Sequence, residues 1–133
     1  MEKLVRDNII DIKIQSGETP LWRHIESIEE KIRFLLEKDR EETLEYEIAI
    51  AFSDRIEEAA DRLEVCDTII DDATVAWYQT LASTYRKEKS DFLVHVKNSG
   101  IPLDLVYAKQ KDKNLIKWGF KKGIILTFEK SEK

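Results

Sequence analysis

Residues 27–66 read SIEEKIRFLLEKDREETLEYEIAIAFSDRIEEAADRLEVC, and this stretch decides the fold. Apolar residues recur in it at helical spacing, first at Ile28, Ile32, Leu35, Leu36, Leu44 and Ile48, then at Ile56, Ala59, Ala60, Leu63 and Cys66. This spacing predicts two amphipathic helices. Ser27 and Glu30 form a capping-box pattern at the start of the first helix, which should run to about Ala51, and Ser53 is an N-cap candidate for the second. Because so little chain joins them, the two helices should pack as an antiparallel hairpin.

The segment before the hairpin is predicted to be a short helix followed by an extended connector. The helix should begin near Arg6, and Ser16-Gly17 should end it. Residues 19–25 should be extended, because Pro20 disfavours helix at the residue before it.

The segment after the hairpin is predicted to be helical up to its tail. We expect the second hairpin helix to extend through Trp77 and Leu81, and residues 74–98 remain compatible with helix. Asn98-Ser99-Gly100 should stop this helix, and Pro102 should open a short one over residues 103–111. Residues 118–128 read as a short hairpin or an extended tail. The whole chain is therefore expected to be a single, mainly α domain over residues 1–133: a helical bundle with a short extended or β C-terminal tail.

Composition agrees with this expectation and excludes some functions. Of 133 residues, 42% are hydrophobic and 37% are charged, with only 4 Gly and 2 Pro, which suits long solvated helices. The net charge of -5 argues against nonspecific binding of a nucleic-acid polymer, which requires a basic surface. Cys66 is the single cysteine, so an intrachain disulfide and a zinc–thiolate cluster are excluded, and we read it as a core residue. No transmembrane run or signal-peptide pattern is found, so we expect a cytoplasmic protein without a membrane partner.

The acidic residues of the hairpin are the most informative feature for function. Glu42 and Glu45 are three residues apart on the first helix, and Glu58 and Asp61 are three apart on the second, so each pair should share one helix face. The second pair should lie beside the apolar side chain of Val65, between two packed partners. Four converging carboxylates repel one another unless a cation compensates them, and Mg²⁺ (or Mn²⁺) suits oxygen ligands. The alternative is that these acids simply face solvent.

Three separate motifs resemble those of a known family. The residues Lys38-x-x-Glu41-Glu42-x-x-Glu45 followed by Glu58-x-x-Asp61 resemble the EExxE…ExxD signature of the all-α nucleotide pyrophosphatases, which include MazG-like proteins and phosphoribosyl-ATP pyrophosphohydrolase. The start, Lys3-Leu4-Val5-Arg6-Asp7-Asn8-Ile9, is similar to the KLVRDxI opening of a small MazG-like branch described as phosphoribosyl-ATP pyrophosphohydrolase-like. The end, Lys113-x-x-x-Lys117-Trp118-Gly119-Phe120, resembles the closing K-x-x-x-R-G-G-F of that branch.

The chain also departs from this pattern. Asp39 and Arg40 stand where apolar residues are common in the family, and Lys117 and Trp118 replace the usual Arg and Gly. The stretch from about residue 71 to residue 98 is longer than in ordinary members of the branch, and we read it as a helical extension used for oligomer contacts or for reshaping the pocket. These departures leave the substrate's base and sugar open.

The resemblance implies an activity and a set of residues. It implies a MazG-like fold and an Mg²⁺-dependent hydrolase, with Mn²⁺ as the alternative metal, that converts an NTP or dNTP and water into NMP and pyrophosphate by attack of an activated water on the α-phosphorus. The expected metal ligands are Glu42, Glu45, Glu58 and Asp61, and Glu41 is expected to be either the base beside the metal or an additional ligand. The expected phosphate-binding residues are Lys3, Arg6, Lys38, Lys113 and Lys117. We also expect a homodimer or homotetramer, because a helical hairpin with two apolar sides requires another subunit to bury one of them. A catalytically weak nucleotide sensor or interaction protein on the same fold is the alternative.

Overall fold

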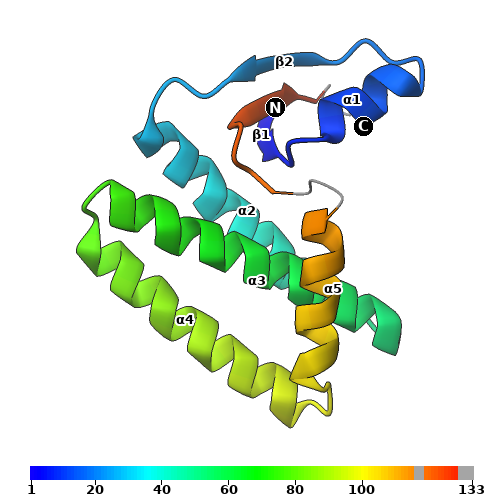
Figure 1. The fold of residues 1–133 in the computed structure, drawn as a ribbon, viewed down its shortest axis with the longest axis vertical. Coiled ribbons are helices and arrows are strands. Elements are labelled where there is room, and N and C mark those ends of the chain that lie inside the picture. Colours follow the sequence, from blue (N-terminus) through cyan, green and yellow to red (C-terminus); the bar gives the residue numbers. More distant parts are fainter. Residues whose placement is uncertain (116–118, 129–133) are drawn as a thin grey trace.

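The computed structural model describes residues 1–115 and 119–128. In these ranges the chain is mainly helical, with a small antiparallel sheet at one end (Figure 1). The helices are α1 (Ile9–Gln15), α2 (Ile28–Ile48), α3 (Phe52–Val75), α4 (Gln79–Asn98) and α5 (Leu103–Leu115), and the strands are β1 (Glu2–Val5), β2 (Leu21–His24) and β3 (Ile124–Thr127). No helix within the described ranges combines the length and apolar character needed to cross a bilayer.

The predicted start of α2 is confirmed. The side chain of Ser27 accepts a hydrogen bond from the backbone N–H of Glu30, with 3.1 Å between the two atoms. The Glu30 carboxylate reaches back to the N–H of Glu26 rather than to that of Ser27, at 3.0 Å, and it also pairs with Arg23 of β2 at 2.9 Å. The helix start and the connecting strand are thus fixed together.

The predicted antiparallel hairpin is confirmed, although its turn differs from the expectation. Ala49 and Ala51 are both extended, and α3 begins at Phe52 with Ala51 as its N-cap, which makes no side-chain hydrogen bond. Ser53 therefore lies inside the first turn, and its assignment as the cap was wrong. The three residues 49–51, of which the first and third are extended, reverse the chain here without a capping side chain.

The expected continuation of this helix through Trp77 and Leu81 was also wrong. The helix α3 ends at Val75, and Trp77 adopts a left-handed φ of 62°. The N–H of Tyr78 bonds to the carbonyl of Ala73 at 2.8 Å and that of Trp77 to the carbonyl of Thr74 at 3.2 Å. These two hydrogen bonds form a Schellman motif at the end of the helix. The motif contains no glycine here, so the sequence did not indicate that the helix ends at this point. The break lets α4 turn back along α3.

The helix α3 is covered on both of its apolar sides by other parts of the same chain. One side contributes Ala59, Ala60 and Leu63 to a core shared with α4 and α5, which includes Phe92 and Val106. The other side packs Val65 and Ile69 against α2 and the sheet, in a core that includes Leu4, Phe34, Phe120 and Ile125. The expectation of a partner subunit therefore no longer follows from the two apolar sides of this helix.

The expected extended tail is confirmed, but its partners are strands from the other end of the chain. The strand β3 lies in the middle of the sheet, in the order β1-β3-β2, and pairs antiparallel with both neighbours. Ile125 stands opposite Leu4 on one side and Arg23 on the other. The tail does not form a hairpin within its described residues, because its hydrogen-bonding edges are taken by β1 and β2. This pairing brings the N-terminal motif beside the acidic helices.

Candidate metal centre

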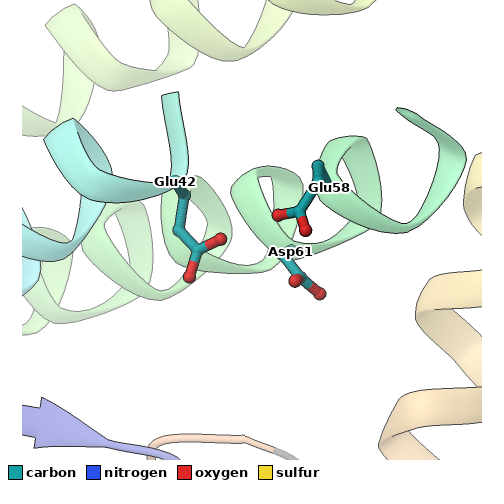
Figure 2. Close-up of side chains that lie close together, drawn as sticks. All are labelled: Glu42, Glu58 and Asp61. Atoms are coloured by element: carbon teal, nitrogen blue, oxygen red, sulfur yellow. The ribbon is translucent and has the colours of Figure 1, made fainter. Parts of the chain in front are cut away.

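Three of the four predicted metal ligands converge in the structure. Glu42 lies on α2, and Glu58 and Asp61 lie one turn apart on α3, at the level where the two antiparallel helices face each other (Figure 2). One carboxylate oxygen from each of the three lies within 4.8 Å of the other two. The spacing of three residues on α3 and the short turn of the hairpin account for this arrangement. The three residues could hold one metal ion.

These carboxylates are largely removed from water. Glu42 is 2% exposed and Asp61 is 9% exposed, while Glu58 is half-buried. Among the described residues, neither Glu42 Oε2 nor Glu58 Oε2 has a hydrogen-bond partner. Buried oxygens without a donor are destabilising, and a bound cation would compensate both.

Their titration reflects this crowding. Burial raises the pKa of Glu42 to about 7, with Arg6 opposing the shift and the negative charge of Asp61 adding to it. Burial also raises the pKa of Glu58 to about 7, helped by the negative charges of Asp61 and Glu45. The pKa of Asp61 is raised by burial as well, although Lys113 and Arg6 lower it. The neighbouring cations thus compensate the cluster only in part.

Glu45, the fourth predicted ligand, stands at the edge of this group. It is half-buried on α2, and its negative charge helps to raise the pKa of Glu58, but it does not belong to the three-acid set. Its place next to Glu58 lets it complete the coordination of an ion held by the other three.

Arg6 and Lys38 approach the cluster from the N-terminal motif and from α2. The Arg6 guanidinium nitrogen Nη2 lies 3.6 Å from Glu42 Oε1 and 3.9 Å from Asp61 Oδ1, so it bridges the two helices. Lys38 Nζ lies 3.8 Å from Glu42 Oε1, one turn along α2. Both cations are mostly buried.

Glu41, the predicted base, lies between two of the predicted phosphate-binding lysines. Its Oε2 is 3.1 Å from Lys3 Nζ, and its Oε1 is 3.7 Å from Lys38 Nζ. It is one residue from Glu42 and is not a member of the three-acid group. Lys38 thus lies between Glu41 and Glu42, and Glu41 with Lys3 forms the rim of the centre.

Lys113 reaches the cluster from α5. Its ammonium group pairs with Asp61 Oδ1 and lies 3.1 Å from Glu57 Oε1. The remaining predicted cation, Lys117, and the neighbouring Trp118 lie outside the described residues. Three of the five predicted phosphate-binding residues thus pair with Glu42 or Asp61, and a fourth, Lys3, pairs with Glu41 at the rim.

The donor set fits a hard divalent cation. All the converging atoms are carboxylate oxygens, the ligands that Mg²⁺ and Mn²⁺ prefer, and neither histidine nor cysteine belongs to the set. An arrangement of solvent-exposed helix faces, the alternative reading of the sequence, does not describe Glu42 and Asp61, because both are buried. Glu42 Oε2 and Glu58 Oε2 have no hydrogen-bond partner among the described residues, so both are free to coordinate a metal ion.

Two further buried acids were not identified from the sequence: one follows Asp61 along α3, and the other connects α2 to α3 and α4. Glu64 continues the stripe Glu58-x-x-Asp61 by three more residues and is 6% exposed, so the same spacing rule could have identified it. Asp39, noted only as a departure from the family pattern, is 7% exposed and accepts hydrogen bonds from Arg62 Nε at 3.2 Å and from the hydroxyl of Tyr85 at 3.1 Å. It connects α2 to α3 and α4, and its partner Tyr85 lies in the stretch read as an extension.

Asp7 of the N-terminal motif has a role that the sequence did not indicate. Its two carboxylate oxygens accept backbone N–H bonds from Lys121 and Lys122, at 3.0 and 2.9 Å, and its own N–H bonds to the carbonyl of Gly119 at 2.7 Å. The two terminal motifs are thereby joined at the centre.

Comparison of the chain with protein-family models, with curated proteins and with solved structures found no match.

Proposed function

We propose that this protein is a divalent-metal-dependent nucleoside triphosphate pyrophosphohydrolase, which converts NTP or dNTP and water into NMP and pyrophosphate. The observation that carries the proposal is the convergence of Glu42, Glu58 and Asp61 with two unpartnered oxygens among the described residues, surrounded by cations that reach them from three different segments. The resemblance of the motifs that supply these residues gives the reaction.

The acids would hold the metal. Glu42, Glu58 and Asp61 would bind it, with Glu45 beside Glu58 as a further ligand. When bound, Mg²⁺ would supply positive charge next to the phosphates and lower the pKa of a coordinated water molecule. The burial of the acids excludes much of the surrounding water, which strengthens every charge interaction in the centre.

The cations would then serve the substrate. Arg6, Lys38 and Lys113 now neutralise the carboxylates that a metal would take over. With those carboxylates compensated, the same side chains become available to phosphate oxygens, for which guanidinium and ammonium groups are well suited. Lys3 would act in the same way at the rim, next to Glu41.

A base must accept the proton of the attacking water. We keep Glu41 in this role, since it adjoins Glu42 and would be released when Lys3 and Lys38 turn to phosphate. A carboxylate at the rim can hydrogen-bond a water molecule that the centre positions.

The experiment measures metal binding and turnover separately. Calorimetric titration of the metal-free protein with Mg²⁺ and with Mn²⁺ tests the centre, and a panel of NTPs and dNTPs with Mg²⁺ is assayed for pyrophosphate. Glu42→Gln and Asp61→Asn should abolish both signals, whereas Asp54→Asn, an exposed acid in the first turn of α3, should keep both.

Each outcome has a distinct meaning. Metal and nucleotide binding without pyrophosphate release would overturn the hydrolase and favour a nucleotide sensor. Failure to bind either metal would overturn the metal centre itself.

A further inference from the structure

A hollow of about 190 Å³ lies beside the metal centre, between α2, α3 and the segment that precedes β3. Its wall includes Lys31, Glu64, Thr68, Asp72 and Gly119. Glu64 is 6% exposed, and neither of its carboxylate oxygens has a hydrogen-bond partner among the described residues. A buried carboxyl group without donors is destabilising, and such groups in native structures call for an explanation.

The neighbouring side chains do not provide the missing donors. The Lys31 ammonium is 3.0 Å from Asp72 Oδ2, and the Thr68 hydroxyl donates to the backbone carbonyl of Glu64 at 2.9 Å. Gly119 lies on the other side of the hollow, where a Cβ built on it would be 4.0 Å from Glu64 Oε1. The carboxyl group of Glu64 therefore lines the hollow with both oxygens unpaired among the described residues, and a ligand seated there would supply the donors.

The position of Glu64 along α3 indicates which part of a nucleotide would reach it. Glu64 follows Asp61 by three residues on the same face, a rise of about 4.5 Å along the helix. In a nucleotide whose α-phosphate lies at the acids, only one ester oxygen and one carbon separate that phosphate from the sugar ring. The sugar hydroxyls therefore come within reach of Glu64 before any group on the base does.

We propose that Glu64 binds the ribose hydroxyls of the substrate, so that the protein selects ribonucleotides over 2′-deoxyribonucleotides. This inference rests on the proposed function for the position of the phosphate. A carboxylate accepts hydrogen bonds from both hydroxyls of a vicinal diol, which is how acidic residues recognise ribose in dinucleotide-binding folds. Burial also raises the pKa of Glu64 to about 7, with Arg6 opposing the shift, which leaves its charged form in need of ligand donors.

Calorimetry tests this without turnover. The probes are the α,β-methylene analogue of ATP and its 2′-deoxy counterpart, each with Mg²⁺. The wild-type protein should bind the ribo form roughly 10- to 100-fold more tightly, as expected for loss of a hydrogen bond to a charged group. Glu64→Gln, which keeps the shape of the side chain, should reduce the preference, and Glu64→Ala should remove it. Asp71→Asn, an exposed acid on the rim of the same hollow, should retain it.

A second readout separates this inference from the proposed function. The kcat/KM of the wild-type protein should be higher for ATP than for 2′-deoxy-ATP or 3′-deoxy-ATP. In the two Glu64 variants, the kcat/KM values for the three nucleotides should differ less. Ribose preference in binding without turnover would leave the inference standing and overturn the hydrolase. Turnover without sugar preference would support the hydrolase and overturn the role of Glu64.

Three results would overturn the role of Glu64. They are equal affinity of the wild-type protein for the two analogues, failure to bind either of them, and a preference that survives in Glu64→Gln and Glu64→Ala. Selectivity that depends on Glu64 but distinguishes GTP from ITP rather than ribose from deoxyribose would assign the residue to the base instead.

Discussion

The guanidinium group of Arg6 lies over the aromatic ring of Phe120, with 5.1 Å between its central carbon and the ring centroid. Phe120 belongs to the core under the sheet, so it gives Arg6 a rigid support. From this position Arg6 reaches Glu42 and Asp61 on two different helices. The two ends of the chain thus cooperate in placing one cation at the acids.

Replacement of Arg6 tests that placement. Arg6→Lys keeps the charge but loses the planar group that spans both helices and lies over Phe120, so we expect kcat/KM for the NTP to fall about tenfold or more. Arg6→Met should lower it further. Arg40→Lys, at an exposed position of α2, is the matched control and should change little. An unchanged kcat/KM in Arg6→Met would contradict the role of this residue.

The stability of the metal-free protein should depend on pH in a defined direction. The pKa of Glu42 is about 7 in the folded protein, against an ordinary value of 4.5 that we take for the unfolded chain. Between these values the folded state binds more protons than the unfolded state, so the free energy of unfolding should fall as pH rises through this window. The loss due to Glu42 should be on the order of 1–3 kcal/mol, and urea unfolding at pH 5 and pH 8 measures it.

Two further measurements test the same mechanism. Glu42→Gln should reduce the pH dependence, because it removes one of the charges that burial destabilises, and the part due to Glu58 and Glu64 should remain. Addition of Mg²⁺ at pH 8 should raise the unfolding midpoint of the wild-type protein, since a metal stabilises the state that binds it. A wild-type protein that becomes more stable from pH 5 to pH 8 without metal would contradict the prediction.

The buried group of Asp39, Arg62 and Tyr85 should contribute to the attachment of α4. Tyr85→Phe removes one hydrogen bond to a buried carboxylate and should lower the free energy of unfolding by about 1–3 kcal/mol. Asp39→Ala also leaves Arg62 without its main partner and should cost about 3–5 kcal/mol. The control is Tyr78→Phe, whose more exposed hydroxyl lies 3.3 Å from Glu29 and should matter little. If Tyr85→Phe and Tyr78→Phe lowered the free energy of unfolding equally, the hydrogen bond from Tyr85 to Asp39 would not stabilise the fold more than a surface contact does.

Asp7 should hold the segment before β3 in place. Asp7→Ala removes both carboxylate acceptors of the N–H groups of Lys121 and Lys122, and the free energy of unfolding should fall by roughly 1–3 kcal/mol. Asp7→Asn keeps one acceptor oxygen and should lie between the wild type and Asp7→Ala. Because this segment also carries Phe120, nucleotide binding should weaken along with stability. Asp11→Asn, an exposed acid in α1, should behave as wild type.

The sequence by itself determined the features that arise within one segment. The periodicity of residues 27–66 predicted the hairpin, Ser27 marked its start, and the three-residue spacing placed Glu58 and Asp61 on one face. Each of these depends on contacts within a turn or two of helix, so neighbouring residues contain the necessary information.

Only the tertiary structure decided the features that join distant segments. The placement of β3 between β1 and β2, the pairing of Asp7 with the segment after Gly119, and the burial of Glu64 beside an open hollow all depend on residues far apart in the chain. The end of α3 at Val75 was not predicted either. The left-handed residue after this helix is Trp77, whereas a glycine is the usual sequence signal for such a residue. Strands of four residues are too short for a periodic signal, and their partners are selected by the packing of the whole core.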